Sequence, residues 1–294
     1  MNNRKRLIPA LVQLLENHAG IWKIHNLLFL VSQIQTKPAF HFIPLSNGCY
    51  SFQLAQDIRS LEKQHTLNAT GEKVEKTDPH DHFMALPDKD KQVLRHIVNK
   101  YGGMSPDELT STIFNEYPQF AVYNPEAQQI PEVKSSKHLK PEQPASSGKI
   151  LFTIGYEGLS LEEYLMKLLA NEVEVLCDVR KNPGSRKFGF SKKTLENACE
   201  CVGIKYQLFT DLGIDKAKRQ NIKTRADKQA LLADYQQTIL REAIEAQMQL
   251  LTCFDHYKKV ALTCYEYEHT ECHRSYLAES LKAMAGQKIT ISHI

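Results

Sequence analysis

The sequence predicts an α/β protein: a mainly helical domain followed by a three-layer, mostly parallel, Rossmann-like sheet domain. From Lys149 onward, five short apolar runs alternate with four amphipathic runs, which is the pattern of a parallel sheet covered by helices. Residues 125–148 are rich in Pro and Ser and have almost no large apolar side chain, which is typical of a linker. We therefore expect domains at residues 1–124 and 149–294.

In the first domain, apolar residues at helical spacing predict two helices within residues 1–33. A turn rich in aromatic residues should follow at 40–51, and then a helix at 52–61. A further helix at 88–101 is introduced by Pro87 and stopped by two glycines, and Ser105 should cap the last one.

The second domain is expected to alternate regularly between strands and helices. The predicted strands span residues 150–154, 173–179, 204–208, 259–263 and 288–292. The predicted helices span residues 161–171, 191–203, 227–254 and 272–285.

Composition excludes several classes of protein. The sequence is 42% hydrophobic and 24% charged, as in a globular protein. Its longest apolar run, Leu27–Val31, is far shorter than a membrane span, and no signal segment develops after the basic N-terminus. Seven cysteines, an odd number at low density, favour reduced thiols over a disulfide scaffold. We expect a cytoplasmic protein with no membrane partner.

Positive charge is concentrated in one part of the chain. The net charge is only +3, yet residues 178–225 hold 12 Lys or Arg against five Asp or Glu. Such an excess marks a surface for phosphate or nucleic acid about as often as a merely solvated face.

The candidate catalytic residues follow two strands that end at the ligand edge of the predicted sheet. The stretch from Cys264 to Arg274 concentrates thiols, imidazoles and carboxylates between a strand and a helix, and a thiol at a helix N-terminus has a lowered pKa. An acidic residue ends the second strand of the domain. The catalytic candidates are Cys272, His273, Glu266, Asp178 and Cys264.

Candidates for binding phosphate lie beside them. A glycine at the end of the first strand of the domain allows close approach of a ligand, and the arginines supply forked donors. These candidates are Gly155, Arg180, Ser185, Arg186 and Arg274, with the alternative that Arg180 simply pairs with Asp178. The sequence has neither a dinucleotide fingerprint nor a P-loop here, so it identifies no cofactor.

The second half of the chain resembles the bacterial domain of unknown function family 488. The resemblance rests on Thr-Ile-Gly-Tyr, on Asp-Val-Arg-x-x-Pro-x-Ser-Arg, and on Cys-x-Glu with Cys-His-Arg near the end, all in the family's order. It implies an α/β fold, but no established reaction. The family's characteristic residues would be Gly155, Asp178, Arg180, Pro183, Ser185, Arg186, Cys264, Glu266, Cys272, His273 and Arg274.

The N-terminal region resembles, over about 40 residues, the Panacea antitoxin-associated domain. The resemblance rests on Leu27-Leu28-Phe29-Leu30, on Phe42 to Ser51, and on Leu54-x-x-Asp57-Ile58-x-x-Leu61. It implies a protein-interaction or regulatory module rather than a catalytic one. A generic helical core with one well-formed turn is the alternative.

Three functions fit these residues. The first is a thiol enzyme acting on a phosphate-bearing substrate such as a nucleotide or nucleic acid. The sequence disfavours the Cys-x5-Arg loop of cysteine phosphatases, because Thr270 and Ala278 stand where that loop needs Arg. The second is a zinc site, for which the donors would be Cys264, His269, Cys272 and His273. The third is a non-catalytic module that binds nucleic acid or protein, in which the thiols belong to the core.

Overall fold

The computed structural model describes residues 1–124, 149–220, 222–286 and 289–294. The chain divides into two compact units, Met1–Lys140 and Pro141–Ile294. The linker predicted at residues 125–148 lies outside the described residues. Among the described residues, no helix is both long and apolar enough to cross a membrane.

The N-terminal unit is mainly helical with two small antiparallel sheets. Its helices are α1 (Asn3–Leu14), α2 (Ile21–Ile34), α3 (Phe52–Lys63), α4 (Asp88–Tyr101), α5 (Pro106–Glu116) and α6 (Pro118–Ala121). Its strands are β1 (His18–Gly20), β2 (Ile43–Leu45), β3 (Gly48–Tyr50), β4 (Leu67–Thr70) and β5 (Lys73–Lys76), which pair in the orders β1-β5-β4 and β2-β3. Ser105 caps α5 through a capping box, as predicted.

The hairpin β4-β5 was not predicted from the sequence. Its strands are short and mostly polar, and only Leu67 and Val74 are buried in them. A four-residue strand with one buried side chain has too little alternation to be recognised. Contact with α1 and α3 positions it in the folded unit.

Helix α2 is the central element of the N-terminal core and contains a buried histidine. His25 is 1% exposed, stacks on Tyr50 with ring centroids 4.7 Å apart, and accepts a hydrogen bond at Nδ1 from the backbone N–H of Ser51 (3.1 Å). Burial lowers the pKa of His25 from 6.5 to about 3. The imidazole is therefore neutral at physiological pH.

The C-terminal unit contains one five-stranded sheet. The strands are β6 (Ile150–Gly155), β7 (Val175–Asp178), β8 (Lys205–Leu208), β9 (Lys259–Cys264) and β10 (Thr290–His293), in the order β10-β6-β9-β7-β8. All four neighbouring pairs are parallel. Buried residues occupy every position of β6 and β7, as expected for strands covered on both faces.

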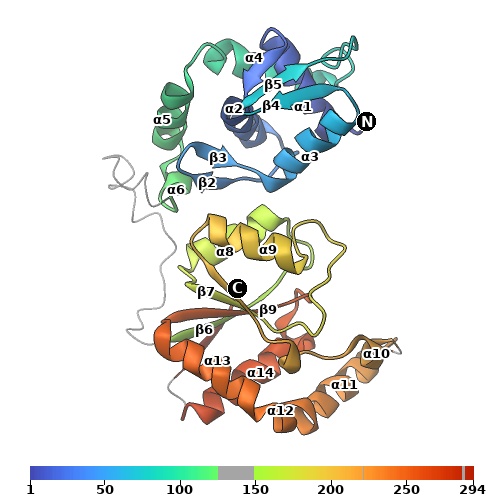
Figure 1. The fold of residues 1–294 in the computed structure, drawn as a ribbon, viewed down its shortest axis with the longest axis vertical. Coiled ribbons are helices and arrows are strands. Elements are labelled where there is room, and N and C mark those ends of the chain that lie inside the picture. The colour runs from blue at the N-terminus through green and yellow to red at the C-terminus, as the bar shows by residue number, and fades with distance from the viewer. Residues whose placement is uncertain (125–148, 221, 287–288) are drawn as a thin grey trace. The chain divides into compact units, whose positions relative to one another are not determined.

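Helices cover both faces of this sheet, which confirms the three-layer α/β fold. The order of the strands requires the crossovers after β6 and β7 to run one way across the sheet and those after β8 and β9 to run back. Right-handed crossovers then place α8 (Leu161–Ala170) and α9 (Lys192–Cys201) on one face, and α13 (Ile244–His256) and α14 (His273–Met284) on the other. Figure 1 shows this separation.

The long helix predicted over residues 227–254 is instead three helices. These are α11 (Arg225–Gln237), α12 (Ile239–Glu242) and α13, and they follow the 3-10 turn Thr210–Leu212 and the short α10 (Lys216–Arg219). Thr238, with φ −111° and ψ −81°, and Ala243, with φ −87° and ψ 41°, interrupt the helical backbone. The hydroxyl of Thr238 donates to the carbonyl of Asp234 (2.8 Å), a contact that bends helices.

Replacing His25 by Asn should reduce the acid sensitivity of the N-terminal unit. In the unfolded chain this histidine binds a proton below pH 6.5, whereas in the folded unit its pKa is about 3, so stability falls as pH drops between these values. We expect this difference in pKa to lower the free energy of unfolding by about 3 kcal/mol at pH 4. His25→Asn keeps an acceptor for the N–H of Ser51 without titrating.

The measurement is urea unfolding followed by fluorescence of Trp22, the single tryptophan of the sequence, which lies 6.1 Å from the His25 ring. Between pH 6.5 and 4 the wild type should lose more stability than the variant. Equal losses would contradict a depressed pKa at His25.

Candidate functional site

The candidate site lies at the carboxyl ends of β6, β7 and β9. Gly155 pairs with Cys264 at the ends of β6 and β9, and Asp178 pairs with Thr263 across β7 and β9. The strand order changes direction around these strands, which is where open α/β sheets bind ligands. Three of the residues predicted from the sequence, Gly155, Asp178 and Cys264, thus lie on neighbouring strand ends.

Gly155 permits a close crossing of two backbones. A Cβ atom at this position would lie 1.8 Å from the carbonyl oxygen of Glu266. The chain after β9 therefore passes directly over the end of β6. Arg274 fixes this segment of the chain, because its guanidinium donates to the carbonyl oxygens of Glu266 and Tyr267.

Four side chains converge where this loop meets α14, and we call them the thiol cluster: Cys264, Glu266, Cys272 and His273. The Sγ atoms of Cys264 and Cys272 lie 3.2 and 3.1 Å from Oε2 of Glu266. The same sulfur atoms lie 3.7 and 3.8 Å from Nδ1 of His273. Both cysteines and His273 are about 1% exposed.

The ring of His273 is oriented by the backbone. Its Nε2 lies 3.0 Å from the carbonyl oxygen of Val179, an acceptor, so Nε2 carries a proton and Nδ1 faces the thiols. Burial lowers the pKa of His273, but the neighbouring Cys264 and the bond to Val179 raise it, and the net shift is upward. The imidazole is therefore suited to exchange protons with a thiol.

The two thiols differ in their electrostatic surroundings. The hydrogen bond from Cys272, the charge of His273 and the guanidinium of Arg219 lower the pKa of Cys264 well below its usual value, against the effect of burial. Burial, followed by the proximity of Cys264 and Glu266, raises the pKa of Cys272 well above it. Cys264 is therefore the thiol that ionises first.

Glu266 links the thiol cluster to a cation. Its Oε1 accepts from Nη1 of Arg219 (3.2 Å), while its Oε2 faces both sulfurs. Burial, and then the charge of Cys264, raise the pKa of Glu266, although Arg219 opposes the shift. The carboxyl group can therefore hold a proton at a higher pH than a solvent-exposed Glu.

Asp178 lies in a separate network. It is completely buried and accepts from Nε of Arg180 (2.8 Å) and from the hydroxyl of Tyr206 (2.7 Å). Arg180 also donates to the hydroxyl of Tyr156 and the carbonyl of Phe190, both at 2.9 Å. The structure thus shows the pairing of Arg180 with Asp178 that the sequence allowed. Asp178 makes no hydrogen bond to the thiol cluster among the described residues.

A cavity of about 330 Å³ opens beside the thiol cluster. Cys264 is the only member of the cluster that lines it. The cations around it are Arg180, Lys181, Arg186, Lys216 and Arg219, and the remaining lining residues are Tyr156, Asn182, Gly184, Ile214 and Tyr265. No acidic residue lines it among those described, so the ionisable side chains at its surface, apart from those of Cys264 and the two tyrosines, are all cationic.

The predicted phosphate-binding residues divide between this cavity and its surroundings. Arg180 and Arg186 line it, whereas Gly155, Ser185 and Arg274 do not. Ser185 shapes the loop after β7, since its hydroxyl accepts from the backbone N–H of Lys187 (3.1 Å). The guanidinium of Arg274 is 1% exposed and engaged by the loop carbonyls described above.

Three cations of the cavity, Lys181, Lys216 and Arg219, were not singled out from the sequence. They belong to the basic run 178–225, and this excess of charge was their only sequence signal. His269, proposed as a zinc ligand, lies outside the thiol cluster. Its ring instead stacks on that of His293, with centroids 3.6 Å apart.

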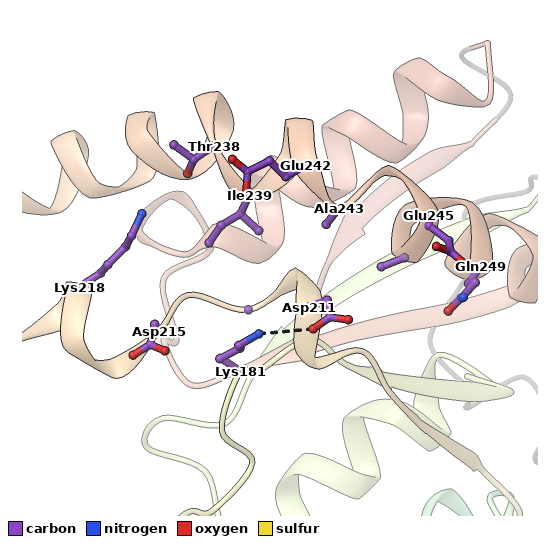
Figure 2. A pocket seen from close by; sticks show the side chains of 12 residues that line it. Lys181, Asp211, Asp215, Lys218, Thr238, Ile239, Glu242, Ala243, Glu245 and Gln249 are labelled. Atoms are coloured by element: carbon purple, nitrogen blue, oxygen red, sulfur yellow. Dashed lines mark hydrogen bonds and ion pairs between the residues drawn. The ribbon is translucent and has the colours of Figure 1, made fainter.

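A larger hollow of about 800 Å³ lies on the other side of Lys181. Figure 2 shows its wall of side chains from α12 and α13 facing the loop with Asp211, which pairs with Lys181 (3.3 Å). No thiol lines it among the described residues. Its ionisable lining residues are four acids and two lysines: Asp211, Asp215, Glu242, Glu245, Lys181 and Lys218. The smaller cavity is therefore the one suited to an anion.

Replacing Gly155 by Ala should disrupt the C-terminal unit, because the new Cβ would overlap the Glu266 carbonyl. We expect a loss of about 3 kcal/mol or more. Urea unfolding followed by far-UV circular dichroism measures it, and Trp22 fluorescence should show the N-terminal unit unchanged.

The matched control is Gly158→Ala. Its Cβ would meet no atom within 4 Å, and its cost comes only from the positive φ of +79°. That cost is about 1 kcal/mol. An equal effect of the two substitutions would contradict the close crossing at Gly155.

Comparison with known proteins bears on the C-terminal unit. Residues 160–281 match the family model described as "Domain of unknown function DUF488", which confirms the resemblance predicted for this half of the chain. The resemblance of the N-terminal region to the Panacea domain stays a prediction. No curated protein and no solved structure matches the chain.

Proposed function

We propose that the DUF488 domain formed by residues 160–281 is the core of an enzyme that acts on a phosphate-bearing substrate, such as a nucleotide or nucleic acid. The observation that carries this proposal is the cavity itself. Five cationic side chains and no described acidic one surround a space that Cys264 also lines. A cavity with convergent charge and a thiol is the default candidate for an active site.

Four of the five cations of the cavity fall into two groups. Arg180 and Arg219 are held by buried or half-buried carboxylates, so their forked donors are fixed before a ligand arrives. Arg186 and Lys216 form no ion pair with any described residue and lie at the exposed rim. We infer that the first group orients the phosphate and the second captures it.

The aromatic lining favours a nucleotide over inorganic phosphate. The rings of Tyr156 and Tyr265 both border the cavity, with centroids 5.4 Å apart. One face of Tyr156 is stacked on Phe190, whereas Tyr265 is 43% exposed. Tyr265 is thus available to stack on a base. At 330 Å³ the space suits one nucleotide unit, free or taken out of a strand.

In this proposal Cys264 meets the substrate and the other members of the thiol cluster act through it. Glu266 and His273 contact its sulfur, and neither they nor Cys272 line the cavity. They can exchange protons with it or hold it in place.

The setting proposed for this activity is a cytoplasm. All seven cysteines are free, which fits a reducing compartment. We propose that the N-terminal unit is a regulatory module that binds a protein partner.

Replacing a rim cation should weaken binding of phosphate ligands. Arg186→Gln and Lys216→Gln should each reduce the affinity for adenosine monophosphate and pyrophosphate roughly 10-fold, since each removes one charge-assisted contact. Isothermal titration calorimetry measures this. Lys193→Gln, an exposed cation of α9 outside the cavity, is the matched control and should bind as the wild type does.

Turnover is tested with phosphate esters, nucleotides and short oligonucleotides, with product formation followed by phosphorus NMR. Cys264→Ser should reduce any activity at least about 100-fold while rim binding persists. Binding that depends on Arg186 without turnover of any substrate would instead identify a non-catalytic binding module. No binding at all would contradict the proposal.

A further inference from the structure

We propose that Cys264, Cys272 and His273 together bind one divalent metal ion of the zinc class. This inference goes beyond the proposed enzyme activity and does not depend on it. It rests on the mutual geometry of three donor atoms, one from each of these residues.

The spacing of these three atoms fits one metal ion. Sγ of Cys264, Sγ of Cys272 and Nδ1 of His273 all lie within 4.8 Å of one another, and Nδ1 lies 3.7 and 3.8 Å from the two sulfurs. Around tetrahedral zinc, neighbouring S and N donors are roughly 3.3–3.8 Å apart. Oε2 of Glu266 lies 3.2 and 3.1 Å from the two sulfurs, beside these ligands.

The surroundings of the cluster have the features of a metal site's outer shell. His273 donates Nε2–H to the carbonyl of Val179 (3.0 Å), which leaves Nδ1 with its lone pair toward the sulfurs. Glu266 is oriented by Arg219, which binds its other oxygen at 3.2 Å. Arg219 also offsets the net negative charge that two thiolates, one carboxylate and a divalent ion would leave.

The donor set selects the class of metal. Two sulfurs and one imidazole suit zinc and related soft or borderline ions, whereas calcium and magnesium prefer sites built of oxygen. On binding, each protonated thiol releases its proton to solvent, and no oxidant or reductant is involved. The ligand set differs from the one proposed from the sequence, since His269 is not part of it.

The test uses the full chain, stripped of metal by a chelator in the presence of a phosphine reductant. Titration with Zn²⁺ against a chromophoric chelator should give one ion per chain with submicromolar affinity. Co²⁺ should bind at the same stoichiometry and produce the absorption of a tetrahedral thiolate complex. Bound metal should also protect Cys264 and Cys272 from alkylation while the exposed Cys201 still reacts.

Variants assign the ligands. Cys272→Ser removes a ligand and Glu266→Gln alters a neighbour of both sulfurs, and each should weaken Zn²⁺ binding at least about 10-fold. His269→Gln and Cys201→Ser change a histidine and a cysteine outside the cluster and should bind Zn²⁺ as the wild type does. If a ligand variant fails to fold, the cobalt spectrum and alkylation protection of the wild type still decide.

The proposal is overturned if the wild-type chain binds no stoichiometric Zn²⁺, if the cobalt spectrum lacks thiolate ligands, or if metal leaves both thiols as reactive as before. Arg186→Gln separates this result from the proposed function. It should keep full Zn²⁺ affinity and lose affinity for pyrophosphate, so either property can fail without the other.

Discussion

The crossing of the Glu266 backbone over Gly155 is the contact on which the site depends. It is possible only without a Cβ atom at residue 155, and Arg274 fixes it by binding the carbonyls of Glu266 and Tyr267. Because the backbone of Glu266 is held over the sheet, its side chain reaches the sulfurs of Cys264 and Cys272. One steric constraint thus brings a strand end, a loop and a helix N-terminus together.

One buried and one half-buried carboxylate organise the cations of the site in parallel ways. Asp178 holds Arg180, and Glu266 holds Arg219, so each guanidinium lines the cavity in a fixed orientation. In each pair the guanidinium lines the cavity, whereas the carboxylate does not. A cavity built in this way attracts anions although the whole chain has a net charge of only +3.

The fold was predictable because its signals are local, whereas much of the site was not. Alternating apolar runs identified strands and helices, but the breaks at Thr238 and Ala243 have no proline or glycine to mark them. Cys264, Glu266, Cys272 and His273 were found because they are close in sequence. Arg219 is 47 residues from Glu266, so only the tertiary fold shows that they pair.

The central claim is that the cavity and the thiol cluster form one site. The most direct test is the rate at which Cys264 of the metal-free chain is alkylated with and without adenosine monophosphate. If the cavity binds a phosphate-bearing ligand beside this thiol, the nucleotide should slow alkylation of Cys264 and leave the exposed Cys201 unaffected. Slowing should be lost in Arg186→Gln. If saturating nucleotide, shown to be bound, leaves the Cys264 rate unchanged, the cavity and the thiol cluster are not one site.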